Sequence, residues 1–304
     1  MHGFPFDIEH FFAKQSQPNR KPNMPADLST FLKSHKFTPP IAVILAEDEI
    51  ELEGTVRHHA ALGFGTILVV GTVTKTAFHD LEGVHTFHAD LNQLEDSVAI
   101  LNEVIKAAPN LWLYYCFNAE YLFYPYSETR SIKDAIAFME EERRASVFTY
   151  TIDLYPENLS DHRAGVDLDT AHLDQNGYYG MDRFDGPDKI DRQPEIFGGL
   201  RWRFEEHIPW GKRRIDRIAL FKTAPKLAVG DDLRLSDPEM NTISCEWHNN
   251  LTMAIMSFRV AKTLMHNPGS AEAIDTFSWG GSSKFEWNAT QLMEFGFMEP
   301  GQWF

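Results

Sequence analysis

Short apolar runs alternate with amphipathic stretches along the chain from residue 41 onward. Three of the runs, Ile41–Leu45, Thr66–Val70 and Leu111–Phe117, are continuously apolar, which predicts strands buried on both faces of a sheet. Val84–Phe87 predicts a further strand between the second and third of these. The stretches between the strands have the apolar spacing of helices, so strands and helices follow each other in turn.

This alternation determines the expected fold. Glu47-Asp48-Glu49 follows the first strand and opens a helix, and Gly63 ends that helix before the second strand. Strands that alternate with helices are joined by right-handed crossovers into a mostly parallel sheet. We therefore predict an α/β fold that begins as half of a doubly wound domain, a fold that binds ligands beyond the carboxyl ends of its strands.

Capping residues mark the start of three later helices. Asn92 with Glu95, and Ser131 with Asp134, have the spacing of an N-cap residue and its partner. Asn288 is placed to begin a last helix. These positions predict helices on both sides of the Leu111–Phe117 strand and one near the end of the chain.

The pattern is less regular beyond residue 145. Val147–Leu154 and Arg217–Lys222 predict two more strands, and Leu251–Met265 has the apolar spacing of a helix. Residues 153–211 are rich in Asp, Gly and Tyr and predict a long loop region. Loop regions of this length inside a compact chain are usually functional.

The same pattern divides the chain into three parts. Residues 1–40 are an N-terminal extension, in which a short helix over Leu28–His35 is stopped by Pro39-Pro40. Residues 41–265 form the α/β domain, and residues 266–304 form a C-terminal segment that packs on it.

Composition and charge narrow the class of protein. The chain has 304 residues, 43% of them hydrophobic, and a formal net charge of −16, which argues against a nucleic-acid partner. Its two cysteines, Cys116 and Cys245, are expected to be buried free thiols of a reducing compartment. No apolar run approaches the roughly 20 residues of a membrane span, and the first residues lack the pattern of a secretory signal. We expect a soluble, cytoplasmic protein.

Acidic residues and a histidine pair surround the first predicted helix. Glu47, Glu49 and their acidic neighbours stand at its start, where carboxylates complement the helix dipole. His58 and His59 lie near its end, and adjacent helical residues point about 100° apart, which makes a poor bidentate metal site. Dipole complementation and packing are one interpretation, and a metal site of these histidines with nearby acids is the other.

A second polar pair, Asn118 and Glu120, follows the most apolar strand at its carboxyl end. Two oxygen-bearing side chains one residue apart can face the same hard cation, which could bridge a diphosphate. The alternative is a polar strand end that begins a turn.

These segments carry a resemblance to a known family. The first strand, its acidic helix, RHHAALGFGTILVV and the apolar strand leading into NAEYLF look like a bacterial family 2 glycosyltransferase with a His-His-x-x-x-Gly pattern, over residues 40–265. The resemblance implies a GT-A fold, in which a half-sheet that binds a nucleotide-sugar is joined to an acceptor half. The family's metal motif is Asp-x-Asp, commonly followed by Glu-Phe-Leu.

The chain departs from that motif. If Glu120-Tyr-Leu aligns with the family's Glu-Phe-Leu, the two Asp positions fall on Phe117 and Ala119 and the metal carboxylates are lost. If Asn118-Ala-Glu120 is itself the motif, one acid remains.

The resemblance implies roles for particular residues. Mg²⁺ or Mn²⁺ would be held by Asn118, Glu120 and His248, with His248 as a packed or capping residue in the alternative interpretation. Inverting transfer also needs a carboxylate base and positive charge near the leaving diphosphate. We predict Asp182 and Glu205 as catalytic carboxylates, and the predicted donor-binding residues are Glu47, Glu49, Asn118 and Arg201.

The predicted function is transfer of a sugar from a nucleotide-sugar donor to a glycan or lipid-linked acceptor of the cell envelope or a polysaccharide, with peripheral membrane contact allowed. Two alternatives stay open. One is a glycosyltransferase fold that has lost its metal motif and serves as a binding or scaffold protein. The other is a metal-dependent hydrolase that uses His58 and His59.

Overall fold

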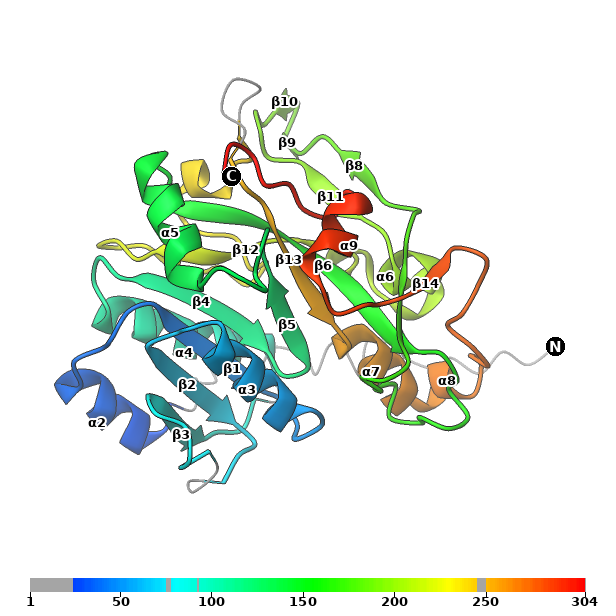
Figure 1. Ribbon diagram of the computed structural model, residues 1–304, viewed down its shortest axis with the longest axis horizontal. Helices are drawn as coiled ribbons and strands as arrows, with labels where there is room; N and C mark the ends of the chain where they lie inside the picture. The colour runs from blue at the N-terminus through cyan, green and yellow to red at the C-terminus, as the bar shows by residue number, and fades with distance from the viewer. Residues whose placement is uncertain (1–23, 75–77, 92, 245–249, 304) are drawn as a thin grey trace.

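The computed structural model describes residues 24–74, 78–91, 93–244 and 250–303. In these ranges, ten strands form one sheet. Figure 1 shows the sheet crossing the molecule with helices packed against it. Strands β1, β2, β3, β4, β6, β13 and β14 run in one direction and β5, β7 and β12 run in the other. The α/β fold with a mostly parallel sheet flanked by helices, predicted from the sequence, is confirmed.

The first half of the sheet is entirely parallel, in the order β3-β2-β1-β4. Every residue of β1, β2 and β4 is buried, because these continuous apolar strands are covered on both faces. The strands are β1 (Ile41–Ala46), β2 (Thr66–Gly71), β3 (Val84–His88) and β4 (Trp112–Phe117), and the crossover helices are α3 (Leu52–Ala61) and α4 (Leu94–Ala107).

The second half of the sheet mixes directions. β12 (Asp216–Lys222) is antiparallel to both of its neighbours, β4 and the long strand β6 (Ser146–Pro156). β13 (Met253–Ser257) lies parallel to β6 and antiparallel to β5 (Glu120–Phe123). β7 (Ala171–Asp174) and β14 (Ser282–Lys284) extend the sheet beyond β6.

The helix predicted over Leu251–Met265 is wrong in its first half. That segment forms β13, whose five residues are all buried between β5 and β6. Only then does α7 (Arg259–His266) begin, followed by α8 (Pro268–Ala271). A short apolar run such as Met253–Ser257 has no periodicity that separates a buried strand from a buried helix, and pairing on both sides decides the outcome.

The first crossover helix also starts later than predicted. Residues 47–51 form a turn, in which the Asp48 carboxylate accepts a hydrogen bond from the backbone N–H of Ile50 at 2.8 Å. Glu51 has a left-handed φ of 60°, and α3 begins after it. Glu47, Asp48, Glu49 and Glu51 are therefore not in the helix, and of the acids after β1 only Glu53 lies in its first turn.

Capping was predicted more accurately. Ser131 and Asp134 form the reciprocal capping box of α5 (Ile132–Glu141), and the Asn288 side chain caps α9 (Ala289–Glu294). Asn92 lies outside the described residues, and α4 begins after Gln93. The remaining elements are short and lie mostly in the loop-rich region: β8 (Tyr179–Met181), β9 (Phe184–Asp185), β10 (Asp188–Lys189), β11 (Glu195–Phe197), α6 (Leu200–Arg203), η1 (Glu205–His207), η2 (Trp210–Lys212) and η3 (Pro238–Asn241).

Both ends of the described chain pack on the sheet. α2 (Ala26–Ser34) buries Leu28 completely, and its Phe31 ring lies 5.1 Å from that of Phe87 on β3. In the C-terminal segment, Phe285 and Leu292 are buried in one cluster with β5 and β13. Cys116 is a buried free thiol, as expected, and Cys245 lies outside the described residues.

Candidate functional site

The carboxyl ends of β1 and β4 bring two predicted segments together. Leu45 and Phe117 are register partners at the ends of these strands, and the Asn118 backbone N–H donates to the Leu45 carbonyl oxygen at 3.1 Å. The Asn118 side chain then donates from Nδ2 to Asp48 Oδ1 at 2.7 Å. The polar residues after the two strands therefore share the sheet edge at which open α/β sheets bind ligands.

Glu120 forms a buried ion pair with Arg217 at this edge. Its Oε2 lies 2.7 Å from Nη2 of Arg217 at the start of β12, and both side chains are almost completely buried. The same carboxylate accepts from the Phe117 N–H and from the Ser257 hydroxyl. Burial acts to raise the pKa of Glu120, but the charge and hydrogen bond of Arg217, the charge of Arg259 and the Phe117 N–H together outweigh burial, and the net effect is a lowered pKa.

Two further cations reach the edge from α7. Arg259 makes a bidentate pair with Glu47, with Nε and Nη2 at 2.7 and 2.6 Å from the two carboxylate oxygens. Its guanidinium carbon also lies 3.8 Å from the centre of the Phe117 ring. Lys262 Nζ lies 3.0 and 2.9 Å from the two oxygens of Asp48.

We call this group the edge cluster. It combines three fixed cations with three carboxylates and one amide from the ends of β1, β4, β12 and β13. Its members are Glu47, Asp48, Asn118, Glu120, Arg217, Arg259 and Lys262.

Lys212 on η2 lies within electrostatic reach of the cluster. Burial lowers the pKa of Lys212, the Arg259 charge lowers it further, and Glu47 is among the acids that oppose both effects. Within the described ranges, its ammonium group makes no ion pair. Glu49, predicted as a donor-binding residue, is exposed in the turn before α3.

The predicted metal site can be tested against this geometry. Glu120 uses both of its oxygens on Arg217, Phe117 and Ser257. Asn118 Oδ1 is buried and has no hydrogen-bond partner in the described part of the chain, so it could supply one neutral oxygen to a ligand. Among the described residues no three His, Cys, Asp or Glu side chains gather as a metal site, and His248 lies outside them. Asn118 and Glu120 in this arrangement do not fit a divalent cation.

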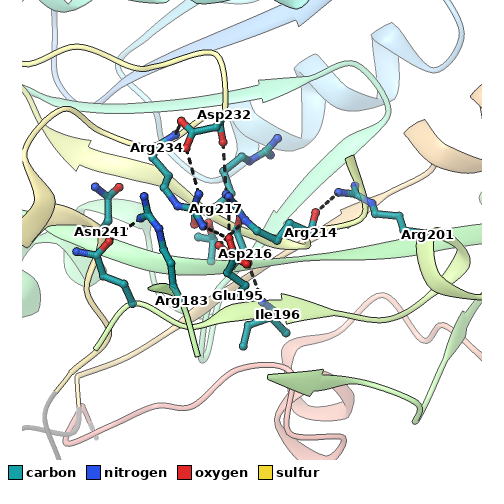
Figure 2. Close-up of polar contacts among 12 residues, drawn as sticks. Arg183, Glu195, Ile196, Arg201, Arg214, Asp216, Arg217, Asp232, Arg234 and Asn241 are labelled. Atoms are coloured by element: carbon teal, nitrogen blue, oxygen red, sulfur yellow. Dashed lines mark hydrogen bonds and ion pairs between the residues drawn. The ribbon is translucent and has the colours of Figure 1, made fainter. Parts of the chain in front are cut away.

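The predicted donor residue Arg201 is also ion-paired. Its Nε lies 3.2 Å from Asp153 Oδ1, and its Nη1 donates to the Arg214 carbonyl oxygen at 2.7 Å, a contact drawn in Figure 2. Asp153 is completely buried, and burial raises its pKa more than Arg201 lowers it. Arg214 in turn pairs with Asp216, so two ion pairs joined by this backbone hydrogen bond connect α6 to the start of β12.

The two predicted catalytic carboxylates, Asp182 and Glu205, each form an ion pair at the protein surface. Asp182 contacts Lys189 at 2.8 Å, and Glu205 contacts Arg213 at 2.7 Å, with about half of each carboxylate side chain exposed. Asp182 lies between β8 and β9, at the top of Figure 1, whereas α7 and the carboxyl ends of β6 and β13 lie at the bottom. The structure therefore does not bring Asp182 to the edge cluster. Glu205 belongs to the segment that also carries Lys212.

The histidine pair is engaged in packing. His58 Nε2 lies 2.8 Å from the Leu122 carbonyl oxygen, and His59 Nδ1 lies 2.7 Å from that of Thr55. His59 is fully buried and stacks on Tyr114, and burial lowers its pKa to about 3. The hydrolase alternative required His58 and His59 to bind a metal together. Each ring instead has a nitrogen in hydrogen-bond contact with a backbone carbonyl oxygen.

An open groove lies next to the 47–51 turn, where the Glu51 carboxylate is 3.4 Å from the hydroxyl of Tyr121, a residue of the groove lining. It has a volume of about 580 Å³ and is lined by His58, Tyr121, Asp169 and Trp287 among others. Trp287 has a left-handed φ of 55°, and its indole N–H donates to the Leu168 carbonyl oxygen at 3.0 Å. Aromatic rings beside the carboxylates of Asp169 and Glu286 form a surface suited to polar ligands with apolar faces.

Sequence reasoning missed Arg217, Arg259 and Lys262. The i, i+3 spacing of Arg259 and Lys262 at the start of a helix was visible, but the segment around it was interpreted as one longer helix. With β13 assigned as a strand, the two basic residues follow a strand's carboxyl end, as Glu47 and Asn118 do. Recognising that strand is the signal that would have identified them.

Comparison with known proteins gives limited similarity. No known protein family and no curated protein matches the chain. Solved structures similar to it include S. aureus TarS 1–349, at 16% identity over 36% of this chain and 34% of that one, with a TM-score of 0.27. S. aureus TarS 1–349 in complex with UDP matches at 15% identity over 36% of this chain and 34% of that one, with a TM-score of 0.27. A structure of S. aureus TarS matches at 15% identity over 36% of this chain and 21% of that one, again with a TM-score of 0.27.

The chain thus spans about a third of the length of the first two TarS structures. At this TM-score the similarity carries no argument about function, which rests on the residues of the site. In the described part of the chain, no helix is long and apolar enough to span a membrane.

Proposed function

We propose that this chain binds a nucleotide-sugar donor at the edge cluster and transfers the sugar, with inversion, to a glycan or lipid-linked acceptor of the cell envelope or a polysaccharide. One observation carries the proposal. Two fixed cations, Arg259 and Lys262, stand at the carboxyl edge of β1 and β4 beside Asn118, whose buried Oδ1 has no hydrogen-bond partner among the described residues.

The chemistry of the cluster matches the charged part of such a donor. An arginine fork binds phosphate oxygens in the same bidentate way in which it binds a carboxylate. Arg259 already presents that fork to Glu47. Asn118 Oδ1 would accept a hydrogen bond from a hydroxyl group of the ligand.

Transfer requires charge stabilisation and a base. As the sugar leaves, negative charge develops on the diphosphate, and Arg259, Lys262 and Lys212 would stabilise it. Of the carboxylates considered, Glu205 is half-exposed and lies in the same segment as Lys212, whereas Asp153 is completely buried. We favour Glu205 over Asp182 as the base that accepts the acceptor hydroxyl's proton.

The groove beside the 47–51 turn is the proposed acceptor site. Tyr121 and Trp287 would contact the apolar faces of sugar rings, and Asp169 would bind their hydroxyl groups. Glu51, at the end of the turn, has its carboxylate 3.4 Å from the Tyr121 hydroxyl. The turn would thereby separate the donor from the acceptor.

A second candidate, a binding protein without transfer, is favoured by another observation. Glu47, Asp48 and Glu120, the carboxylates of the edge cluster, are all ion-paired, so none of them is a free base. Such a protein would bind the donor and release no nucleotide. Both candidates therefore predict that the chain binds the nucleotide-sugar donor, and only the transferase predicts that the nucleotide is released.

Thermal unfolding with UDP, GDP and CMP, followed by a nucleotide-release assay with the corresponding sugar nucleotides, tests the proposal. A ligand at 100 times its dissociation constant stabilises the native state by about 2.7 kcal/mol. Stabilisation together with acceptor-dependent release supports the transferase. Stabilisation without release supports the binding protein, and no stabilisation by any of the three contradicts both.

A further inference from the structure

The ion pairs of the edge cluster differ in how far solvent reaches them. Glu120 and Arg217 are 1% and 6% exposed, so this pair is sealed. Glu47 and Arg259 are 27% and 30% exposed, and a ligand in solution can reach both of them. In the third pair, Asp48 is 40% exposed but Lys262 only 4%, so among the described ion pairs of the cluster Glu47–Arg259 is the one that exposes both partners to another anion.

Glu47 has few ties besides Arg259. Within the described residues, its carboxylate makes no hydrogen bond other than the two to that guanidinium, and it belongs to a turn. Asp48, in contrast, is held by Lys262, by Asn118 Nδ2 and by the Ile50 backbone N–H. The Glu47 side chain can therefore leave its place without disturbing Asp48.

Arg259 would keep its position when Glu47 leaves. Its guanidinium lies against the Phe117 ring, 3.8 Å from the ring centre, at the buried end of β4. A cation held over an aromatic face is attracted to it without any carboxylate. The fork is thus pre-positioned for a second anion of the same shape.

We propose that the Glu47 carboxylate occupies, in the ligand-free protein, the place of a phosphate group, and that a nucleoside diphosphate binds Arg259 by displacing it, without a divalent cation. The inference rests on the proposed function, because that function supplies the diphosphate. It adds the mode of binding: the fixed cations Arg259 and Lys262 replace the metal, and Glu47 acts as an internal competitor.

The charge of the site supports binding without a metal. A divalent ion at Asn118 and Glu120 would lie beside Arg217 and Arg259, which already supply positive charge there. The repulsion between like charges at such distances opposes metal binding in a partly buried site. A diphosphate, in contrast, brings the negative charge that Arg259 loses when Glu47 moves away.

The test measures the affinity of the protein for inorganic pyrophosphate and for UDP by calorimetry. Each titration is done once with Mn²⁺ and once with EDTA, at about 1 mM. Glu47→Gln keeps the shape of the side chain and removes the competing charge. Glu47→Ser shortens the side chain so that it no longer contacts Arg259. Both variants should bind each probe about tenfold more tightly than the wild type, equally in Mn²⁺ and EDTA. Arg259→Met, which keeps the contact with Phe117, should lose binding of both probes.

The control is Glu103→Gln, which breaks the exposed pair with Lys106 and should leave both affinities unchanged. Unchanged or weaker binding by the Glu47 variants, or binding that requires Mn²⁺, overturns the inference while leaving a donor site in place. Tighter pyrophosphate binding by the Glu47 variants without any UDP binding supports the exchange and contradicts the nucleotide-sugar function. If neither probe binds any variant, both proposals fail.

Discussion

Nη2 of Arg217 lies 2.7 Å from Oε2 of Glu120, and this buried pair joins the start of β12 to the start of β5. Removing one partner of a buried pair leaves an uncompensated charge, which typically costs about 3–5 kcal/mol. We expect Arg217→Met to lower the free energy of unfolding by that amount in urea denaturation. The double variant with Glu120→Gln should recover most of the loss. Equal losses in the single and double variants would contradict this account.

Glu103→Gln is the matched control for that measurement. The Glu103–Lys106 pair is about half exposed or more on both sides, and such pairs contribute little to stability. This substitution should change the free energy of unfolding by less than about 0.5 kcal/mol.

Stability should fall in mild acid because of His59. Burial lowers the pKa of His59 to about 3 in the folded protein, so the unfolded chain binds the proton first as pH falls below the ordinary value of 6.5. The stability associated with neutral His59 is therefore present above pH 6.5 and is lost as pH falls toward 3. Between pH 7.5 and 5.5 this group alone should cost about 1.4 kcal/mol.

His59→Asn provides the comparison, because it keeps a donor for the Thr55 carbonyl oxygen and does not titrate. The pH dependence of its urea denaturation should be shallower than that of the wild type by the same amount. Parallel pH profiles for the two proteins would show that His59 is not the group responsible.

Gly71 ends β2 at the edge where the site is built. Its φ is +140°, and an added Cβ would lie 2.1 Å from the Ala46 carbonyl oxygen. Gly71→Ala should therefore destabilise the fold by about 3 kcal/mol or more. Gly177 also has a left-handed φ, but a Cβ there meets no atom within 4 Å, so Gly177→Ala should cost only about 1–2 kcal/mol. Similar losses for the two variants would contradict the role of the Ala46 contact.

Trp287 tests the acceptor groove. Trp287→Ala should raise the acceptor KM in the nucleotide-release assay about tenfold by removing a stacking surface, and the donor affinity should not change. Trp279 is 43% exposed and does not line the groove, so Trp279→Ala should leave the acceptor KM as it is. A loss of donor affinity in Trp287→Ala would place the indole at the donor instead.

The sequence predicted the parallel half of the sheet because its signals are local. β1, β2 and β4 are short apolar runs that are buried along their whole length, and Gly63 follows the helix between the first two strands. Met253–Ser257 has the same apolar character, but a helical pattern continues directly after it, and only pairing with β5 and β6 distinguishes it as a strand.

The same contrast explains the site. Asn118 and the acids after β1 could be placed together because parallel strands end at one edge. The partners of those acids could not, because 212 residues separate Glu47 from Arg259 and 97 separate Glu120 from Arg217. No local pattern shows which basic residue a carboxylate will meet. Tertiary pairing of this kind also changed Glu120 from an expected metal ligand into a structural group.

A crystal structure of the protein with the nucleoside diphosphate that stabilises it most is the most direct test of the central claim, that the edge cluster is the donor site. We expect the diphosphate to contact Arg259 and to lie near Lys262, with the Glu47 side chain turned away. A diphosphate bound elsewhere, with the Glu47–Arg259 pair intact, would contradict the claim.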